Sequence, residues 1–351
     1  MKSIDKINVF RRKLTKFLSS LFVTNEIEYK EDFVKNINIK RIMIIRPNHR
    51  LGNQLLLTPL VEEVSLIFPN CEIDLFLKGT LGNEIFSNFD NVINIIELPK
   101  KHFKHPFKYI SSWLKLKRKK YDLVINAIGN SSSGKLATKI SNSKLKFYGV
   151  KSLSPKSSGY KHIAKLPIYN LRAFLLNIGF NVAKTKVPPL NIKLSYTEII
   201  EGNKIILKIV KNNRKTISLF TYATNDKCYS KEWWDEFYQM LLIKFPNYNI
   251  IEILPIENIS NLSIDIPKFY SKNIREIASV IANTTFFIGA DSGMMHLASS
   301  SQATTIGLFS VTELNTYTPY DNDSIAVNTN IINKKGIIRL IDNIIINKIE
   351  Y

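Results

Sequence analysis

The feature that most constrains the fold of this chain is a repeated alternation of short apolar runs with longer amphipathic segments. Runs such as Arg41–Arg46 (RIMIIR) and Asp122–Asn126 (DLVIN) have the length and apolar character of buried strands. Strands that alternate with helices form parallel sheets, so the pattern predicts an α/β fold. The alternation stops at 184–194 (KTKVPPLNIKL), where two prolines are adjacent, and then restarts. We therefore expect two doubly wound sheets that face each other across a cleft.

The pattern predicts the following elements and boundaries. The expected strands are Arg41–Arg46, Glu72–Leu77, Val92–Ile96, Asp122–Asn126, Leu145–Tyr148, Thr216–Phe220, Asn249–Ile253, Thr285–Ile288 and Thr304–Phe309. The expected helices run from Gly52 to about Phe68 and over 107–119, 231–244, 274–283 and 293–300. The expected units are an extension (1–40), a first domain (41–183), a linker (184–194), a second domain (195–330) and a closing helix (331–351).

Charge points to an anionic partner. The chain has 351 residues, and 49 Lys and Arg against 29 Asp and Glu give a net charge of +20. Such an excess suits nucleic acid, a membrane surface or a phosphorylated substrate. Two cysteines, Cys71 and Cys228, exclude a disulfide scaffold and a cysteine-rich zinc site, and reducing cytosol is the simpler compartment.

The amino-terminal 1–40 is a basic amphipathic stretch. Its apolar residues recur at helical spacing and are interrupted by basic ones: Phe10, Leu14, Phe17, Leu18, Leu21 and Phe22, with Arg11, Arg12, Lys13 and Lys16. A helix packed on the body and a helix on a membrane surface both fit this pattern. The interruptions argue against a signal peptide, and no apolar run reaches the roughly 18–20 residues of a membrane span.

The sharpest local signal is the segment 286–310 (FFIGADSGMMHLASSSQATTIGLFS), which predicts a strand, a short turn and a helix. Asp291 or Ser292 is placed to cap this helix. The first N–H groups and the helix dipole form an anion site, and Gly293 lets a phosphate approach the backbone. His296, in the first turn, is able to donate to a phosphate oxygen. The alternative is a capped turn that binds no ligand.

A second polar loop follows the first strand, in 46–64 (RPNHRLGNQLLLTPLVEEV). It places Asn48, His49, Arg50 and Asn53 at the mouth of the first sheet. His49 is a candidate base because histidine titrates near neutrality, and Arg50 is able to hold a phosphate through two hydrogen bonds. An ordinary solvated loop is the alternative.

A third polar loop lies in 221–237 (TYATNDKCYSKEWWDEF), directly after an expected strand. It offers Thr221, Thr224 and Lys227 before an amphipathic helix. Lys227 is a suitable point charge for a diphosphate, although a loop lysine is more commonly only solvated.

The segment 129–135 (GNSSSGK) fits the spacing of a phosphate-binding loop. Such a loop needs Ser or Thr next, to place a hydroxyl on magnesium, and this chain has Leu136 there. We interpret the segment as a Ser-rich turn that starts a helix. The absence of G-x-G-x-x-G and of zinc-ligand spacing among the five histidines argues against a nicotinamide site and a catalytic zinc.

The basic run 101–120 interleaves aromatic residues with Lys and Arg. Single-stranded nucleic acid, anionic lipid and a solvated helix face are all compatible with this composition.

Three of these segments resemble glycosyltransferase family 9, the ADP-heptose:lipopolysaccharide heptosyltransferases, and the resemblance extends over about 40–325. The segment 41–77 resembles the opening strand, loop, helix and strand of that family. The segment 117–129 (KRKKYDLVINAIG) resembles its basic helix and fourth strand. The segment 274–320 resembles the donor-site block, the most specific of the three.

The resemblance implies a GT-B fold, in which two Rossmann-like domains face a cleft, with the acceptor on the first domain and the nucleotide-sugar on the second. It implies inverting transfer of a heptose-like sugar, from an ADP-linked donor to an anionic glycolipid such as a lipopolysaccharide core. No metal or other cofactor is expected. The expected place is the cytoplasmic face of the inner membrane, where the extension and the 101–120 helix would contact the anionic surface. We expect a monomer and no nucleic acid.

The resemblance also assigns residues. Asp291 would contact the donor sugar. The diphosphate would be held by Ser292, Gly293, Met294, Met295 and His296, together with Lys227, with Thr221 in the same loop and Glu257 near the nucleoside. The acceptor would be bound by Asn48, Arg50 and Gly52.

The chain departs from the family at the first loop. The family sequence D-R-I-G-D ends in an Asp that is expected to act as the base, whereas this chain has His49-Arg50-Leu51-Gly52-Asn53. A neutral Asn53 amide cannot accept the proton. Either His49 is the base, or Asn53 only orients the acceptor and another group takes the proton. The replacement leaves open another glycosyltransferase or epimerase of the same fold, and a degenerate nucleotide-sugar binder.

Overall fold

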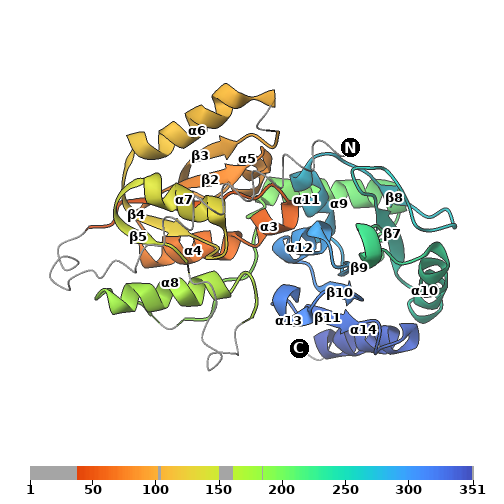
Figure 1. Ribbon diagram of the computed structural model, residues 1–351. Coiled ribbons are helices and arrows are strands. Elements are labelled where there is room, and N and C mark those ends of the chain that lie inside the picture. The colour runs from red at the N-terminus through yellow and green to blue at the C-terminus, as the bar shows by residue number, and fades with distance from the viewer. Residues whose placement is uncertain (1–37, 102–103, 150–160, 184, 350–351) are drawn as a thin grey trace.

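The computed structural model describes residues 38–349, except 102–103, 150–160 and 184. In these residues two sheets lie side by side, each covered by helices (Figure 1). Nearly all of the predicted extension 1–40 lies outside the described residues. The predicted boundaries of the two domains and the linker remain predictions.

The first sheet and its helices come from the amino-terminal half. In chain order they are β1 (Arg41–Arg46), α3 (Leu51–Leu55), α4 (Thr58–Ile67), β2 (Glu72–Lys78), α5 (Leu81–Ile85), β3 (Val92–Leu98), α6 (Pro106–Arg118), β4 (Lys120–Asn126), α7 (Ser132–Ile140), β5 (Asn142–Phe147) and α8 (Leu166–Asn177).

The second sheet and its helices come from the carboxyl-terminal half. They are α9 (Tyr196–Val210), β6 (Thr216–Phe220), the 3₁₀ helix η3 (Asn225–Lys227), α10 (Lys231–Lys244), β7 (Asn249–Ile253), β8 (Lys268–Phe269), α11 (Ile274–Ala282), β9 (Phe286–Ala290), α12 (Gly293–Ser300), β10 (Thr305–Phe309), α13 (Leu314–Tyr317), β11 (Ile325–Asn328) and α14 (Lys334–Ile349).

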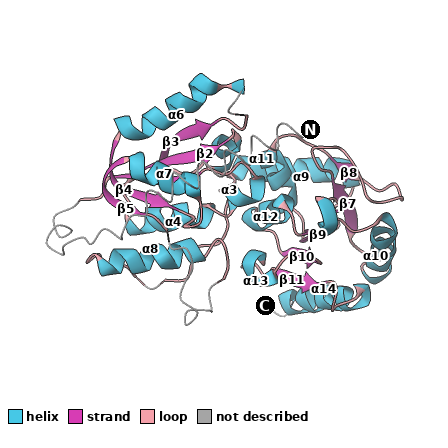
Figure 2. Cartoon of the chain, viewed as in Figure 1, coloured by secondary structure: helices cyan, strands magenta, loops and turns pink. Residues whose placement is uncertain are grey.

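Both sheets are parallel and doubly wound (Figure 2). The first has the order β3-β2-β1-β4-β5, and the second has the order β11-β10-β9-β6-β7-β8. In each sheet the chain starts in the middle, moves to one edge, and then crosses back to build the other side. The predicted α/β fold is therefore confirmed, and each predicted strand overlaps a strand of the structure.

The predicted single helix from Gly52 to about Phe68 is wrong, because the segment forms two helices, α3 and α4. Pro59 lies in the first turn of α4 and has no N–H to continue the hydrogen bonding of α3. The Thr58 hydroxyl instead donates to the carbonyl of Leu55, at 2.8 Å. This break turns α3 away from α4 and leaves it as a short element at the mouth of the first sheet.

The largest apolar cluster runs through both halves. It contains Ile44 and Leu75 of the first sheet, Phe220 and Phe287 of the second, and Met295 of α12, all essentially inaccessible to solvent. The outer faces of the sheets have separate clusters under α6 and α7, and under α10 and α14. Burial of apolar surface therefore holds the two halves together as well as each sheet to its helices.

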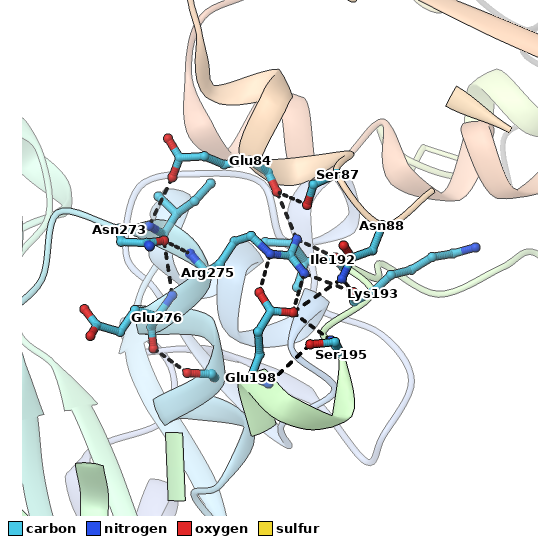
Figure 3. Close-up of polar contacts among 12 residues, drawn as sticks. Glu84, Ser87, Asn88, Ile192, Lys193, Ser195, Glu198, Asn273, Arg275 and Glu276 are labelled. Atoms are coloured by element: carbon cyan, nitrogen blue, oxygen red, sulfur yellow. Dashed lines mark hydrogen bonds and ion pairs between the residues drawn. The ribbon is translucent and has the colours of Figure 1, made fainter. Parts of the chain in front are cut away.

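A polar cluster joins the halves beside α9 and α11 (Figure 3). The Arg275 guanidinium donates to both carboxylate oxygens of Glu198, at 2.5 and 2.8 Å. It also donates to the carbonyls of Glu84, Ile192 and Lys193, at 2.9, 3.1 and 3.0 Å. The hydrogen bonds from Arg275 lower the pKa of Glu198 to about 2. One cation thus joins α5 of the first half, the connecting segment and α9.

Candidate functional site

The candidate site lies at the carboxyl ends of β6 and β9, which are neighbours in the second sheet. The strand order reverses at this pair, because β7 lies beyond β6 and β10 lies beyond β9. Ligands of doubly wound sheets bind in the crevice at such a reversal. The loops that leave the two strands carry Lys227 and Asp291, so the structure brings together two residues that are 64 positions apart.

Asp291 is the centre of this group. Its carboxylate is buried and accepts hydrogen bonds from Lys227 Nζ and Thr312 Oγ1, each at 2.5 Å. The Lys227 side chain is 31% exposed, so its ammonium group is reachable from the crevice while Asp291 holds it in place. Sequence reasoning did not find Thr312, which lies in the loop after β10.

The start of α12 has the predicted turn and serine cap. Ser292 caps the helix and accepts a hydrogen bond from the N–H of Met295, at 3.4 Å. Ser292, Gly293 and Met294 are partly exposed, whereas Met295 is buried in the core. The first N–H groups of a helix have no partner within the helix, and its dipole favours an anion at that end. The same turn therefore anchors α12 through Met295 and presents its N–H groups at the crevice.

His296 is the buried member of the predicted set. Burial lowers the pKa of its imidazole, and the nearby Asp291 carboxylate opposes that shift only in part. A neutral imidazole at physiological pH keeps one N–H donor and one acceptor nitrogen. A second buried histidine, His162 of the first half, also lowers the pKa of His296. The pKa of His162 itself is lowered to about 4, chiefly by burial.

The first half meets α12 through α3. A Cβ on Gly52 would lie 2.8 Å from His296 Cδ2, and a Cβ on Gly293 would lie 3.2 Å from the Gly52 nitrogen. A Cβ on Gly52 would therefore clash with His296, whereas a Cβ on Gly293 would require a small displacement of α3. The predicted acceptor residue Gly52 and the predicted donor residue Gly293 are in contact across the two halves.

The other predicted residues of the first loop are exposed or partly exposed. Asn48 fixes the turn by accepting a hydrogen bond from the N–H of Arg50, at 3.0 Å. The side chains of His49 and Arg50 are exposed. The pKa of His49 is lowered by partial burial and then by the charges of Lys78, Lys100 and Arg50. The structure thus places His49 in a basic surrounding within the first half.

Arg46 is a site residue that sequence reasoning missed. It ends β1, is only 8% exposed, and donates to the Asn53 amide oxygen at 2.6 Å. Burial lowers the pKa of the guanidinium to about 10, so it is still charged at neutral pH. The available signal was an arginine at the last position of an apolar central strand. Asn53 is therefore a hydrogen-bond acceptor for a buried cation.

Two further residues of the predicted donor site, Thr221 and Glu257, differ in their surroundings. Thr221 is buried and donates to the carboxylate of Glu252, at 2.6 Å, while Ser260 donates to the other oxygen at 2.7 Å. Glu257 is exposed on the loop that follows β7. The sequence signal for Glu252 was a single acidic residue inside the apolar strand NIIEI.

Among the described residues, no cluster of three or more His, Cys, Asp or Glu side chains is arranged to hold a metal ion. Within the same part of the chain, no helix is both long and apolar enough to cross a membrane.

Part of the candidate site lies in a segment that matches a known family model. Residues 271–337 match the model of glycosyltransferase family 9 (heptosyltransferase). This match contains Asp291, all of α12 and Thr312, and confirms the resemblance stated above for the donor-site block. No curated protein sequence matches the chain.

Solved structures share the fold at low sequence identity. The family 9 glycosyltransferase of Veillonella parvula is 18% identical, with a TM-score of 0.65 over 82% of this chain and 85% of its own. The E. coli heptosyltransferase WaaC with ADP is 16% identical, with a TM-score of 0.66 over 86% and 99%. The E. coli ADP-heptose lps heptosyltransferase II is 13% identical, with a TM-score of 0.64 over 88% and 99%.

The two parallel, doubly wound sheets and these matches define the class of fold, which is the GT-B fold of the heptosyltransferases. Within that class, the match of the donor-site block identifies family 9 as the family that this chain resembles.

Proposed function

We propose that the chain is an inverting glycosyltransferase that moves a heptose-like sugar from ADP-heptose to a lipopolysaccharide core or related anionic glycan. The observation that carries the proposal is the Lys227–Asp291 pair at the start of α12, inside the segment that matches family 9. A cation and a row of free N–H groups at one point suit a diphosphate.

The proposed chemistry follows from these groups. The bond between the anomeric carbon and the diphosphate oxygen breaks, and the bond between that carbon and the acceptor oxygen forms. Negative charge develops on the leaving nucleoside diphosphate, where Lys227 and the N–H groups of α12 stabilise it. Asp291 holds Lys227 in position and faces the sugar. In this proposal the residues supply the stabilisation without a metal.

The acceptor hydroxyl must lose a proton, and His49 is the proposed base. Its lowered pKa keeps the imidazole neutral at physiological pH, which is the form that accepts a proton. Asn53, held by Arg46, would orient the acceptor. Replacement of His49 by Gln should abolish transfer and leave ADP affinity unchanged; near-normal transfer would exclude His49 as the base.

A membrane-facing surface is proposed on α6, at the outer edge of the first half (Figure 1). Its exposed face has an apolar stripe of Phe107, Ile110 and Leu114, which are 87, 56 and 48% exposed. Lys115, Lys117 and Arg118 follow in the last turn, and the first turn has no acidic residue. An apolar stripe beside basic residues is typical of helices that lie on anionic membranes. This surface supports a peripheral place at the inner membrane, on its cytoplasmic side.

Nucleotide titration tests the donor assignment. ADP, UDP and GDP are titrated into the protein by calorimetry, with and without EDTA. We expect selective ADP binding that survives EDTA and is lost in Lys227→Ala. A preference for UDP or GDP would leave the fold assignment unchanged and would point to a different class of donor sugar. The absence of any nucleotide binding would contradict the donor site.

Vesicle binding tests the membrane surface. Phe107→Ser/Leu114→Ser should weaken binding to vesicles that contain anionic lipid, while ADP binding is retained. Wild-type binding should also fall steeply with salt, since salt screens the basic residues. Unchanged vesicle binding by the double variant would contradict a role for this face.

A further inference from the structure

A pocket of about 370 Å³ lies at the carboxyl ends of β2 and β3, in the first half. Its lining includes Gly79, Leu98, Lys100, Lys101, His105 and Lys108. The carboxyl ends of parallel strands are where doubly wound sheets bind ligands, and this pocket is separate from the junction of β6 and β9. None of the predicted donor or acceptor residues lines it.

The floor of the pocket is fixed by Gly79. Its N–H donates to the Leu98 carbonyl at 2.8 Å, which ties the end of β2 to the end of β3. Gly79 has a φ of +81°, and a Cβ there would lie 2.6 Å from Lys100 Cε. Only glycine combines this conformation with this contact. The Lys100 methylene groups therefore lie against Gly79 at the floor.

The pocket is tied to the loop that follows β1. The buried Gln54 donates to the carbonyls of Asn48 and Lys78, at 2.9 and 3.0 Å. These two hydrogen bonds hold the Asn48–Arg50 turn against the end of β2. The charges of Lys78 and Lys100 consequently act on the His49 imidazole.

The charges around the pocket are unbalanced. Glu97 is the acidic residue of the lining, and it is already bound by the Asn83 amide at 2.7 Å and by Lys108 at 3.4 Å. Within the described part of the chain, Lys100 and Lys101 have no ion-pair partner. Concentrated positive charge in a concave site attracts a negatively charged ligand. A lining that combines Leu98 and Pro99 with several lysines suits a sugar-sized group that carries a phosphate or carboxylate.

We propose that this pocket binds an anionic substituent, a phosphate or a carboxylate, on the acceptor glycan and so positions the acceptor beside the loop that follows β1. The assignment to the acceptor rests on the proposed function. The anion site itself stands independently, because it uses other residues than the diphosphate site at α12.

Histidine NMR with inorganic phosphate as the probe tests the site. The full chain is labelled at its histidine ring carbons and titrated with phosphate in the presence of saturating ADP. His49 and His105 report on the pocket, and His296 reports on the start of α12. We expect phosphate to shift the His49 and His105 signals. Lys100→Ala/Lys101→Ala should raise the half-saturating phosphate concentration by about tenfold, because charge-assisted hydrogen bonds are lost.

The matched control is Lys208→Ala/Lys215→Ala, which removes the same charge from exposed positions of the other half and should leave the titration unchanged. Shifts that persist in Lys100→Ala/Lys101→Ala, or a response of His296 alone, would overturn the proposal. Failure of the donor assignment looks different: ADP would leave the His296 signal unmoved, while His49 and His105 would still respond to phosphate. Titration with acetate in place of phosphate then distinguishes a phosphate site from a carboxylate site.

Discussion

Two helices of this chain, α7 and α12, are built alike and placed differently. Each follows a strand next to the central strand of its sheet, β4 beside β1 and β9 beside β6. Each is capped by a serine, since Ser131 accepts from the N–H of Gly134 at 3.1 Å and Ser292 accepts from that of Met295. Each has a glycine in its first turn.

The two helix starts differ in what faces them. A Cβ on Gly134 would lie 2.3 Å from Asn126 Oδ1, an atom of the same sheet. The nearest neighbour of Gly293 is Gly52, in the other half. The start of α7 is thus closed by its own half, whereas the start of α12 lies where the two halves meet and has a buried acid–lysine pair beside it. Location and neighbouring charge, and not the cap, make α12 the candidate site.

The largest expected effect is that of Asp291→Asn on transfer. The variant removes the buried charge that holds Lys227, so the rate should fall by about 10²–10³, the usual cost of losing one preorganised electrostatic group. The measurement is kcat with the proposed donor, ADP-heptose, beside the Kd for ADP, which should change little. The control Lys135→Ala, in the first turn of α7, should keep the wild-type rate. A wild-type kcat in Asp291→Asn would place the chemistry elsewhere.

Acid should destabilise the junction through its buried histidines. The pKa of His162 is about 4 in the folded chain and near 6.5 when unfolded, so the unfolded state binds more protons between these values. The contribution of His162 to the free energy of unfolding, about 3 kcal/mol, is present above pH 6.5 and is lost as the pH falls to 4. Urea denaturation at several pH values checks this. His162→Gln should flatten the slope, and an unchanged slope would argue against the assignment.

Replacing the first-turn glycines of α7 and α12 by alanine should affect stability and activity to different extents. Gly134→Ala forces a shift inside the first half and should lower the free energy of unfolding by about 1–3 kcal/mol. Gly293→Ala requires only a small displacement between the halves, so transfer should suffer more than stability. Urea denaturation and kcat are measured for both variants. Equal losses of stability would show that the two starts are packed alike.

The smallest expected effect concerns the caps. Ser131→Ala and Ser292→Ala should each cost about 1 kcal/mol of stability, the typical value for a helix N-cap. Only Ser292→Ala should also weaken ADP binding, because it changes the helix start that faces the donor. The comparison of the two Kd values decides the point, and weaker ADP binding in Ser131→Ala would contradict it.

The sequence predicted the parts of the molecule that depend on local pattern. The strands Arg41–Arg46, Thr216–Phe220 and Asn249–Ile253 have the predicted bounds, because apolar runs bounded by polar loops identify buried parallel strands. The serine turn before α7 was also predicted. The short edge strand β8 was not, since two residues, Lys268 and Phe269, carry no periodicity.

Contacts between segments that are far apart in the chain could not be predicted from the sequence. The residues next to Arg46 in the chain do not show that its guanidinium is buried against Asn53. Those next to Thr221 do not show that its hydroxyl donates a hydrogen bond to Glu252. The donor-site block was recognised because its candidate binding residues are adjacent in the chain. The polar partners of the first loop were missed because they come from β1 itself and from other strands.

The Arg275 guanidinium has a consequence for sequence change. Three of its five hydrogen bonds go to main-chain carbonyls, those of Glu84, Ile192 and Lys193. Every amino acid supplies the same carbonyl, so this join does not depend on the side chains at those three positions. Among the atoms of the described residues that the Arg275 guanidinium binds, only the two carboxylate oxygens of Glu198 belong to a side chain. The side chains at Ile192 and Lys193 in the connecting segment can therefore change while the hydrogen bonds from Arg275 to their carbonyls are retained.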